Sequence, residues 1–195
     1  MAKKKSNRER IITAALALAE SDGWVGLSMA DIATKAKLKP AEVLREFPSK
    51  TGLLWGILES IDHTVLAEKR NADEPPRDRL FDVLMSRFDA LNAHKGAIKA
   101  IARGVPRDPL MSLLSAPRFM MSMAWMLEAA GISSAGLKGL LRTKGLALVY
   151  LNAARVWLRD DSADMSKTMA ALDKGLRRAE RFTGMCKSSR TTTAD

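Results

Sequence analysis

Residues 27–54, LSMADIATKAKLKPAEVLREFPSKTGLL, constrain the fold more than any other segment, because they predict two short helices, a tight turn and a third helix. Ser28 suits the N-cap of the first helix. Pro40 fits the first position of the second helix, which ends before Pro48. Ser49 caps the third helix, whose apolar side chains keep helical spacing. This is the layout of a helix-turn-helix, a motif that places its second helix in the major groove of DNA.

The second helix of this motif has an apolar side and a polar side. Its inner face is predicted to consist of Val43, Leu44 and Phe47. The positions predicted to face outward are Lys39, Ala41, Glu42, Arg45 and Glu46. Arg45 is the best candidate for a base contact, because its guanidinium fork can pair with guanine.

Other candidate DNA contacts lie outside the second helix. Ser28 and Lys50 stand at helix starts, which suit phosphate. A basic arm precedes the first predicted helix, and it is expected to reach phosphates or an adjacent minor groove. The alternative is a solvated arm with no role in DNA binding, as most charge runs are. The complete predicted DNA-binding set is Lys4, Lys5, Arg8, Ser28, Lys39, Ala41, Arg45 and Lys50.

Residues on both sides of the motif extend this pattern over the first 65 positions. The matching residues are Ile11, Ile12, Ala15 and Leu18 of an opening helix, then Gly23-Trp24, Leu27-Ser28 and Asp31-Ile32-Ala33, and finally Phe47-Pro48-Ser49-Lys50 and Leu53-Leu54. In this order and spacing the segment resembles the DNA-binding domain of the TetR family of transcriptional regulators. The resemblance implies an all-α fold, with a small three-helix DNA-binding domain followed by a larger helical domain for ligand binding and dimerisation.

The recognition helix departs from the family's usual pattern at several positions. The family usually carries an aromatic residue where Leu44 stands and a His or Tyr where Glu46 stands, and both commonly contact phosphate. The carboxylates of Glu42 and Glu46 are unfavourable beside a polyanion. These two residues are therefore expected to lower the affinity for DNA without removing it.

The rest of the chain has the periodicity of helices. Apolar stripes predict helices through Leu80–Leu91 and Ile98–Ala102, and over about Pro109–Ala130, Ser134–Leu158 and Ser162–Phe182. No convincing alternating strand or hairpin turn interrupts them. The sequence therefore predicts an all-α protein with a DNA-binding domain at 1–65, a ligand-binding and dimerisation domain at 66–185 and a disordered tail at 186–195.

The charge distribution and the single cysteine suggest a cytoplasmic protein that binds nucleic acid. The formal net charge is +10, and the positive charge lies mainly at the two ends of the chain. The single Cys186 builds no disulfide framework, which favours a reducing compartment. The N-terminus does not have the pattern of a signal peptide, and no apolar run approaches the roughly 18 residues of a membrane span, so no stable membrane insertion is expected.

An enzyme is the class that the sequence favours least. His63 and His94 are the only histidines, and neither has the spacing of a metal ligand. A glycine-rich phosphate loop after a strand is also absent from the sequence. We therefore expect no catalytic residues, no metal site and no cofactor.

The helix predicted at 109–130 is rich in methionine. Arg118 and Glu128 are its only charges, so it is expected to be mostly buried. Methionine suits an adaptable pocket, but it also fills ordinary cores. The resemblance implies that an effector binds in this domain, and the chemistry favours a small apolar or amphipathic molecule. The predicted ligand-binding residues are Phe88, Met120, Met123, Trp125 and Trp157.

The last two predicted helices carry more apolar surface than one domain face needs. The resemblance implies that they pack on a second copy as a four-helix interface about a two-fold axis. The predicted interface residues are Leu146, Val149, Tyr150, Ala153 and Leu172. A buried helix in a monomer is the alternative.

A second resemblance covers residues 150–182 only. This run is similar to the C-terminal part of the lipid-binding accessory proteins of ubiquinone biosynthesis, which have a TetR-like fold. It implies an alternative function, DNA-independent lipid or quinone binding. The sequence favours a TetR-type regulator instead, acting as a homodimeric, ligand-responsive repressor on a palindromic operator.

Overall fold

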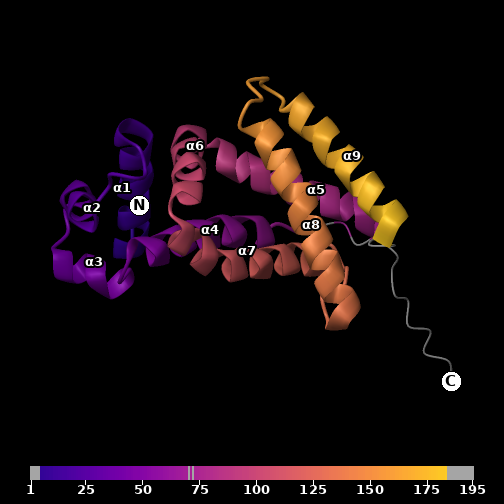
Figure 1. The fold of residues 1–195 in the computed structure, drawn as a ribbon, viewed down its shortest axis with the longest axis horizontal. Helices are drawn as coiled ribbons and strands as arrows, with labels where there is room; N and C mark the ends of the chain where they lie inside the picture. The colour runs from indigo at the N-terminus through magenta and orange to yellow at the C-terminus, as the bar shows by residue number, and fades with distance from the viewer. Residues whose placement is uncertain (1–4, 70, 72, 184–195) are drawn as a thin grey trace. The chain divides into compact units, whose positions relative to one another are not determined.

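The computed structural model describes residues 5–69, 71 and 73–183, and its regular elements are helices (Figure 1). In chain order they are α1 (Asn7–Asp22), α2 (Met29–Ala36), α3 (Pro40–Glu46), α4 (Lys50–Leu66), α5 (Pro76–Asn92), α6 (Lys95–Gly104), the 3-10 turn η1 (Val105–Arg107), α7 (Pro109–Ala129), α8 (Gly136–Trp157) and α9 (Ser166–Thr183). The described residues contain no strand, so the predicted all-α class is confirmed. Lys4 and the tail 186–195, for which the sequence predicts a DNA contact and disorder, lie outside the described residues.

The chain folds into two compact units. The first contains the residues up to Asp62 together with Ala90–Arg118, and the second contains His63–Asp89 and the residues from Phe119 onward. The helices α4, α5 and α7 therefore each contribute to both units. In α7 the division lies between Arg118 and Phe119, one residue after Pro117, whose ring removes a backbone hydrogen bond from the helix interior.

The core of the first unit joins α1 to the helix-turn-helix and to α6. A capping box starts α1: the hydroxyl of Ser6 accepts the Glu9 N–H at 3.2 Å, and the Glu9 carboxylate accepts the Ser6 N–H at 2.7 Å. Buried apolar residues shared by these helices include Ile11, Ala15, Trp24, Ile32, Val43, Phe47, Leu53 and Ile57. Ala97 and Ile101 of α6 belong to the same core, because α6 packs along α1. The helix-turn-helix is thus supported by a helix from much further along the chain.

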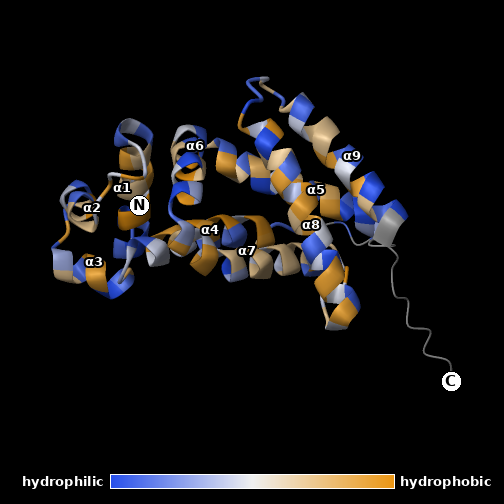
Figure 2. Cartoon of the chain, in the orientation of Figure 1, coloured by the Kyte–Doolittle hydropathy of each residue, from blue (hydrophilic) through white to orange (hydrophobic). Residues whose placement is uncertain are grey.

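The second unit is built around aromatic side chains and the α8–α9 pair. Phe88 of α5 stacks on Tyr150 with ring centroids 5.1 Å apart, and the Trp157 ring lies 6.0 Å from Phe88. The buried Arg87 donates from Nε to the Tyr150 hydroxyl at 3.1 Å. Outside its buried side, α9 is mainly hydrophilic (Figure 2).

The turn between α8 and α9 is organised by one buried carboxylate. Asp160 accepts hydrogen bonds from the backbone N–H and the hydroxyl of Thr168, at 2.8 and 2.7 Å, and from Ser162. These bonds hold the pKa of Asp160 well below its usual range, with the Ser162 hydroxyl contributing most. The expectation that this helix begins at about Ser162 is wrong, because α9 begins at Ser166, and the Asp160 carboxylate caps its first turn by accepting the Thr168 N–H.

The prediction that the methionine-rich helix is mostly buried is wrong for α7. One side of it is buried, but Leu110, Leu113, Leu114, Met121 and Trp125 on the other sides are exposed. Among the described residues, α7 is the helix whose length and hydropathy would suit a membrane span, and 33% of its most apolar window is buried. Core helices of globular proteins share these properties, so α7 by itself does not indicate insertion.

Candidate nucleic-acid interface

The first helix of the motif, α2, is fixed at both ends. At its start the hydroxyl of Ser28 accepts the Asp31 N–H at 3.2 Å, and Asp31 accepts the Ser28 N–H and hydroxyl at 3.0 and 2.6 Å. These bonds from Ser28 lower the pKa of Asp31. At its end Lys37 adopts a left-handed conformation with φ 55°, and Arg10 of α1 donates to the carbonyls of Ala36 and Lys37 at 2.8 and 3.0 Å. The turn that leads into the recognition helix is therefore tied to α1.

The recognition helix α3 is anchored by its own acidic residue. The Glu42 carboxylate accepts the Lys39 N–H at 2.9 Å and the side-chain amide of Asn7 at 3.3 Å. The Lys39 bond is the main cause of the lowered pKa of Glu42. Glu42 therefore has partners within the domain, and the sequence, which predicts only repulsion from DNA, does not reveal them.

The inner side of α3 is formed by Val43 and Phe47, both of which are buried. The Phe47 ring packs directly on α4 at Gly56, where an added Cβ would lie 2.3 Å from the ring. The prediction that Leu44 belongs to this inner face is wrong, because 63% of Leu44 is exposed. One residue along a helix turns the side chain by about 100°, which carries Leu44 away from the core that covers Val43.

Two cations on the exposed side of α3 remain available for a ligand. Lys39 and Arg45 are exposed, and neither side chain forms a hydrogen bond or ion pair with another described residue. Ala41 is exposed beside them, as predicted. Lys5 is also exposed, directly before α1.

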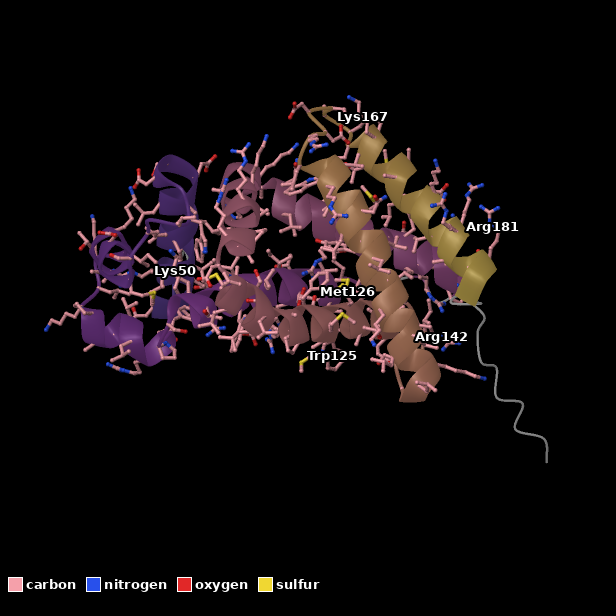
Figure 3. The ribbon with its side chains drawn as sticks, viewed as in Figure 1. Lys50, Trp125, Met126, Arg142, Lys167 and Arg181 are labelled. Atoms are coloured by element: carbon pink, nitrogen blue, oxygen red, sulfur yellow. The ribbon has the colours of Figure 1, made fainter. Side chains whose placement is uncertain are left out.

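The other predicted phosphate contacts are engaged inside the domain. Lys50 donates to the carbonyls of Trp24 and Val25, and its ammonium nitrogen lies 5.0 Å from the centre of the Trp24 ring (Figure 3). Burial lowers the pKa of Lys50. Arg8 pairs with Glu59 at 2.6 Å and lies over the ring of Phe47. The Ser28 hydroxyl is likewise bound to Asp31. Lys50, Arg8 and Ser28 therefore mainly stabilise the fold, which the sequence does not reveal because their partners are set by tertiary contacts.

The sequence of this segment matches a known family. Residues 11–55 fit the sequence model of the bacterial regulatory proteins of the tetR family. This segment is a TetR-family helix-turn-helix domain. No curated protein sequence matches the chain.

The structure as a whole resembles solved TetR regulators. A TetR transcriptional regulator from Nitrosomonas europaea is similar with a TM-score of 0.72 and 20% identity, over 91% of this chain and 99% of that one. One from Rhodococcus sp. RHA1 gives 0.63 and 23%, over 87% and 96% of the two chains, and one from Streptomyces coelicolor gives 0.59 and 20%, over 92% and 84%. The chain therefore has the fold, as well as the N-terminal domain, of TetR-family transcriptional regulators.

Within this TetR fold, the predicted ligand-binding residues are only partly brought together. Phe88 and Trp157 meet in the aromatic core, Met123 is fully buried and Met120 is half-buried. Trp125 is 56% exposed and lies on the outer side of α7, next to the buried Met126 (Figure 3). Trp125 is therefore separated from the other four side chains.

Four of the predicted dimer-interface residues are covered within one chain of this TetR fold. Leu146, Tyr150, Ala153 and Leu172 are buried, and Val149 is half-buried against Gly175 of α9. A partner subunit needs side chains that are accessible in the protomer. On α8 these are Leu137, Leu140, Leu141, Leu148 and Leu151, which are exposed. Apolar content alone does not reveal which side of α8 is covered by α9.

Proposed function

We propose that this protein is a DNA-binding transcriptional regulator of the cytoplasm that acts as a homodimer on an approximately palindromic operator. The observation that carries the proposal is a pair of exposed cations at α3, Lys39 at its N-cap and Arg45 in its last turn, whose side chains have no hydrogen-bond or ion-pair partner among the described residues. They stand on the helix that a TetR domain presents to the major groove. Arg45 supplies the donor fork for a guanine, and Lys39 supplies a phosphate contact.

The charges around α3 support binding to a polyanion. Lys35 and Lys37 are exposed at the end of α2, close in sequence to Lys39. The carboxylate of Glu42 is directed to Lys39 N–H and Asn7. Its negative charge is therefore balanced in part by donors of the domain, which leaves Glu46 as the main acidic residue that opposes DNA on this helix.

The proposed dimer forms through the outer side of α8. Its exposed leucines recur at positions 137, 141, 148 and 151, which is the spacing of one helical face. The exposed side of α9 carries cations instead, namely Lys167, Lys174, Arg177, Arg178 and Arg181. Like charges facing each other across a two-fold axis would repel, so the apolar centre of the interface is proposed on α8 with α9 at its margin.

An apolar or amphipathic effector is proposed to bind in the second unit, where Phe88, Met123 and Trp157 are buried and Met120 is half-buried. Residues of α4 belong to both units, which makes this helix the proposed route between effector and recognition helix. A ligand changes DNA affinity only if it binds the DNA-bound and free forms differently. The solved structures named above are regulators, so they offer no support for the alternative of a quinone-synthesis accessory protein.

Selection from a random DNA library with the full chain tests the proposal. We expect enrichment of one motif with two-fold symmetry, and binding that weakens steeply with salt. The half-sites are expected about one helical turn apart, because each protomer presents one recognition helix. A library that returns no enriched motif, with only weak binding that is lost at moderate salt, would overturn the proposal.

A further inference from the structure

The outer surface of the recognition helix carries an apolar groove in addition to its cations. This groove, which we call the α3 groove, is lined by Met29, Ala30, Pro40, Ala41, Leu44 and Pro48 over Val43 and Phe47, and its volume is about 460 Å³. All of its lining side chains are apolar. Leu44, with 63% of its surface exposed, is its most prominent large side chain.

An exposed leucine on a DNA-reading helix limits what that helix can recognise. Leu44 and Ala41 have no side-chain donor or acceptor, so they cannot pair with the hydrogen-bonding edges of bases. In the major groove, the apolar feature that distinguishes one base from the others is the C5-methyl group of thymine. An apolar groove is the surface that such a methyl group fits.

The charges beside the groove favour DNA as its occupant. Lys39 and Arg45 flank Ala41 and Leu44 along the chain, and both cations are exposed. An apolar partner protein would have to desolvate these charges or supply carboxylates to match them. The phosphate backbone supplies matching charges on both sides of the major groove, at distances that do not depend on base sequence.

We infer that Leu44 and Ala41 read thymine methyl groups in each half-site of the operator. This inference rests on the proposed function and adds the base identity that the groove selects. Residues 41 to 45 span about 6 Å along a helix, and base pairs are about 3.4 Å apart along the duplex. The thymine therefore lies within about two base steps of the guanine that Arg45 contacts.

Deoxyuridine provides the direct test, because it differs from thymidine only in lacking the methyl group. Starting from the motif enriched by selection, each thymine position is replaced symmetrically by deoxyuridine, and the dissociation constant is measured for each duplex. One buried methyl contributes about fourfold in affinity. We expect about fourfold weakening per half-site, or about 15-fold for the symmetric pair, at one thymine position and little change at the others.

A variant at Leu44 connects the effect to the groove. In L44A the affinity for the thymine duplex is expected to fall, and the preference for thymine over deoxyuridine at that position is expected to shrink to less than twofold. Val25→Ala is the matched control, since Val25 is a similarly exposed apolar residue of the same unit and lies outside the groove. V25A should keep the full preference. Circular dichroism should show unchanged helix content in both variants.

The possible failures are distinguishable. Absence of any enriched motif would count against the proposed function itself. A specific motif whose thymines can all be replaced without loss, or an L44A variant that keeps the full thymine preference, would overturn the inference while leaving the regulator intact. Capture of a protein partner by the groove, abolished by L44A with no change in DNA binding, would also overturn it.

Discussion

Two exposed leucine surfaces of this protein have different surroundings. On α3, Leu44 lines the α3 groove and lies along the chain between Lys39 and Arg45, two cations without ion-pair partners. On α8, several exposed leucines follow one side of a helix over about four turns, with Lys144 the cation between Leu141 and Leu148. The α3 surface has adjacent cations that suit phosphate, whereas the α8 surface has the extent of a helix-packing face. Exposed apolar area alone does not identify a partner; its extent and its neighbouring charges do.

The largest expected effect is at the exposed leucines of α8, where a charged substitution should disrupt the proposed dimer. Leu148→Glu should weaken the dimer by about four orders of magnitude, because the two-fold axis buries two unpaired carboxylates, each costing about 3 kcal/mol. Analytical ultracentrifugation over a micromolar concentration range measures the change. Lys138→Glu, a charge change at an exposed position about 100° round the same helix from Leu137, is the control and should have a much smaller effect. A wild-type protein that sediments as a monomer at micromolar concentration would contradict the proposal that the exposed leucines of α8 form a dimer interface.

The reading of bases by α3 is tested next by Arg45→Ala. Loss of its guanidinium should change the preference at one base position of each half-site by about 1–3 kcal/mol, because one bidentate pair with guanine is lost. Competition binding with operators changed one base pair at a time measures this preference. A uniform loss at every position would show instead that Arg45 contacts only phosphate.

Acid should weaken the turn between α8 and α9. The native carboxylate of Asp160 has a pKa held below its ordinary value of 3.8 by bonds from Ser162 and Thr168. The unfolded chain therefore binds this proton more readily, so the stability contributed by Asp160 is complete above about pH 4 and decreases as the pH falls below it. Asp160→Asn should lower the urea midpoint at pH 7 and remove this part of the acid dependence. Asp89→Asn, at an exposed position of the same unit, is the control and should preserve both.

The smallest expected effect distinguishes a lysine that contacts DNA, Lys39, from one that stabilises the domain, Lys50. Lys39→Ala should weaken binding to all sequences alike and reduce the slope of log affinity against log salt by about one, because one phosphate contact is lost. Lys50→Ala should leave the slope unchanged and lower the thermal midpoint instead, since its ammonium group is bound to the carbonyls of Trp24 and Val25. Equal loss of salt slope in both variants would place Lys50 on the DNA as well.

Local signals in the sequence were sufficient to predict most of the helices, although not the first residue of α9. The capping box at Ser28 and the proline at position 40 are recognisable because each acts within a few residues of the chain. The same holds for the helix-turn-helix, whose order of caps, prolines and apolar positions is a local pattern. Arg45 was also placed correctly on the exposed side of α3. The position of Leu44 was not, because α3 is too short for its apolar spacing to distinguish a buried side from a partly covered one.

The sequence by itself determined the fold class, the segments that are helical and the family of the N-terminal domain, because these follow from interactions between near neighbours. Only the tertiary structure decided which side of each helix is covered. Lys50 donates to the carbonyls of Trp24 and Val25, which lie 26 and 25 residues earlier in the chain. Val149 of α8 packs against Gly175 of α9. Such contacts join parts of the chain that no periodicity relates. For this reason the exposed leucines of α3 and α8, on which the proposed partners depend, became visible only once the helices were packed.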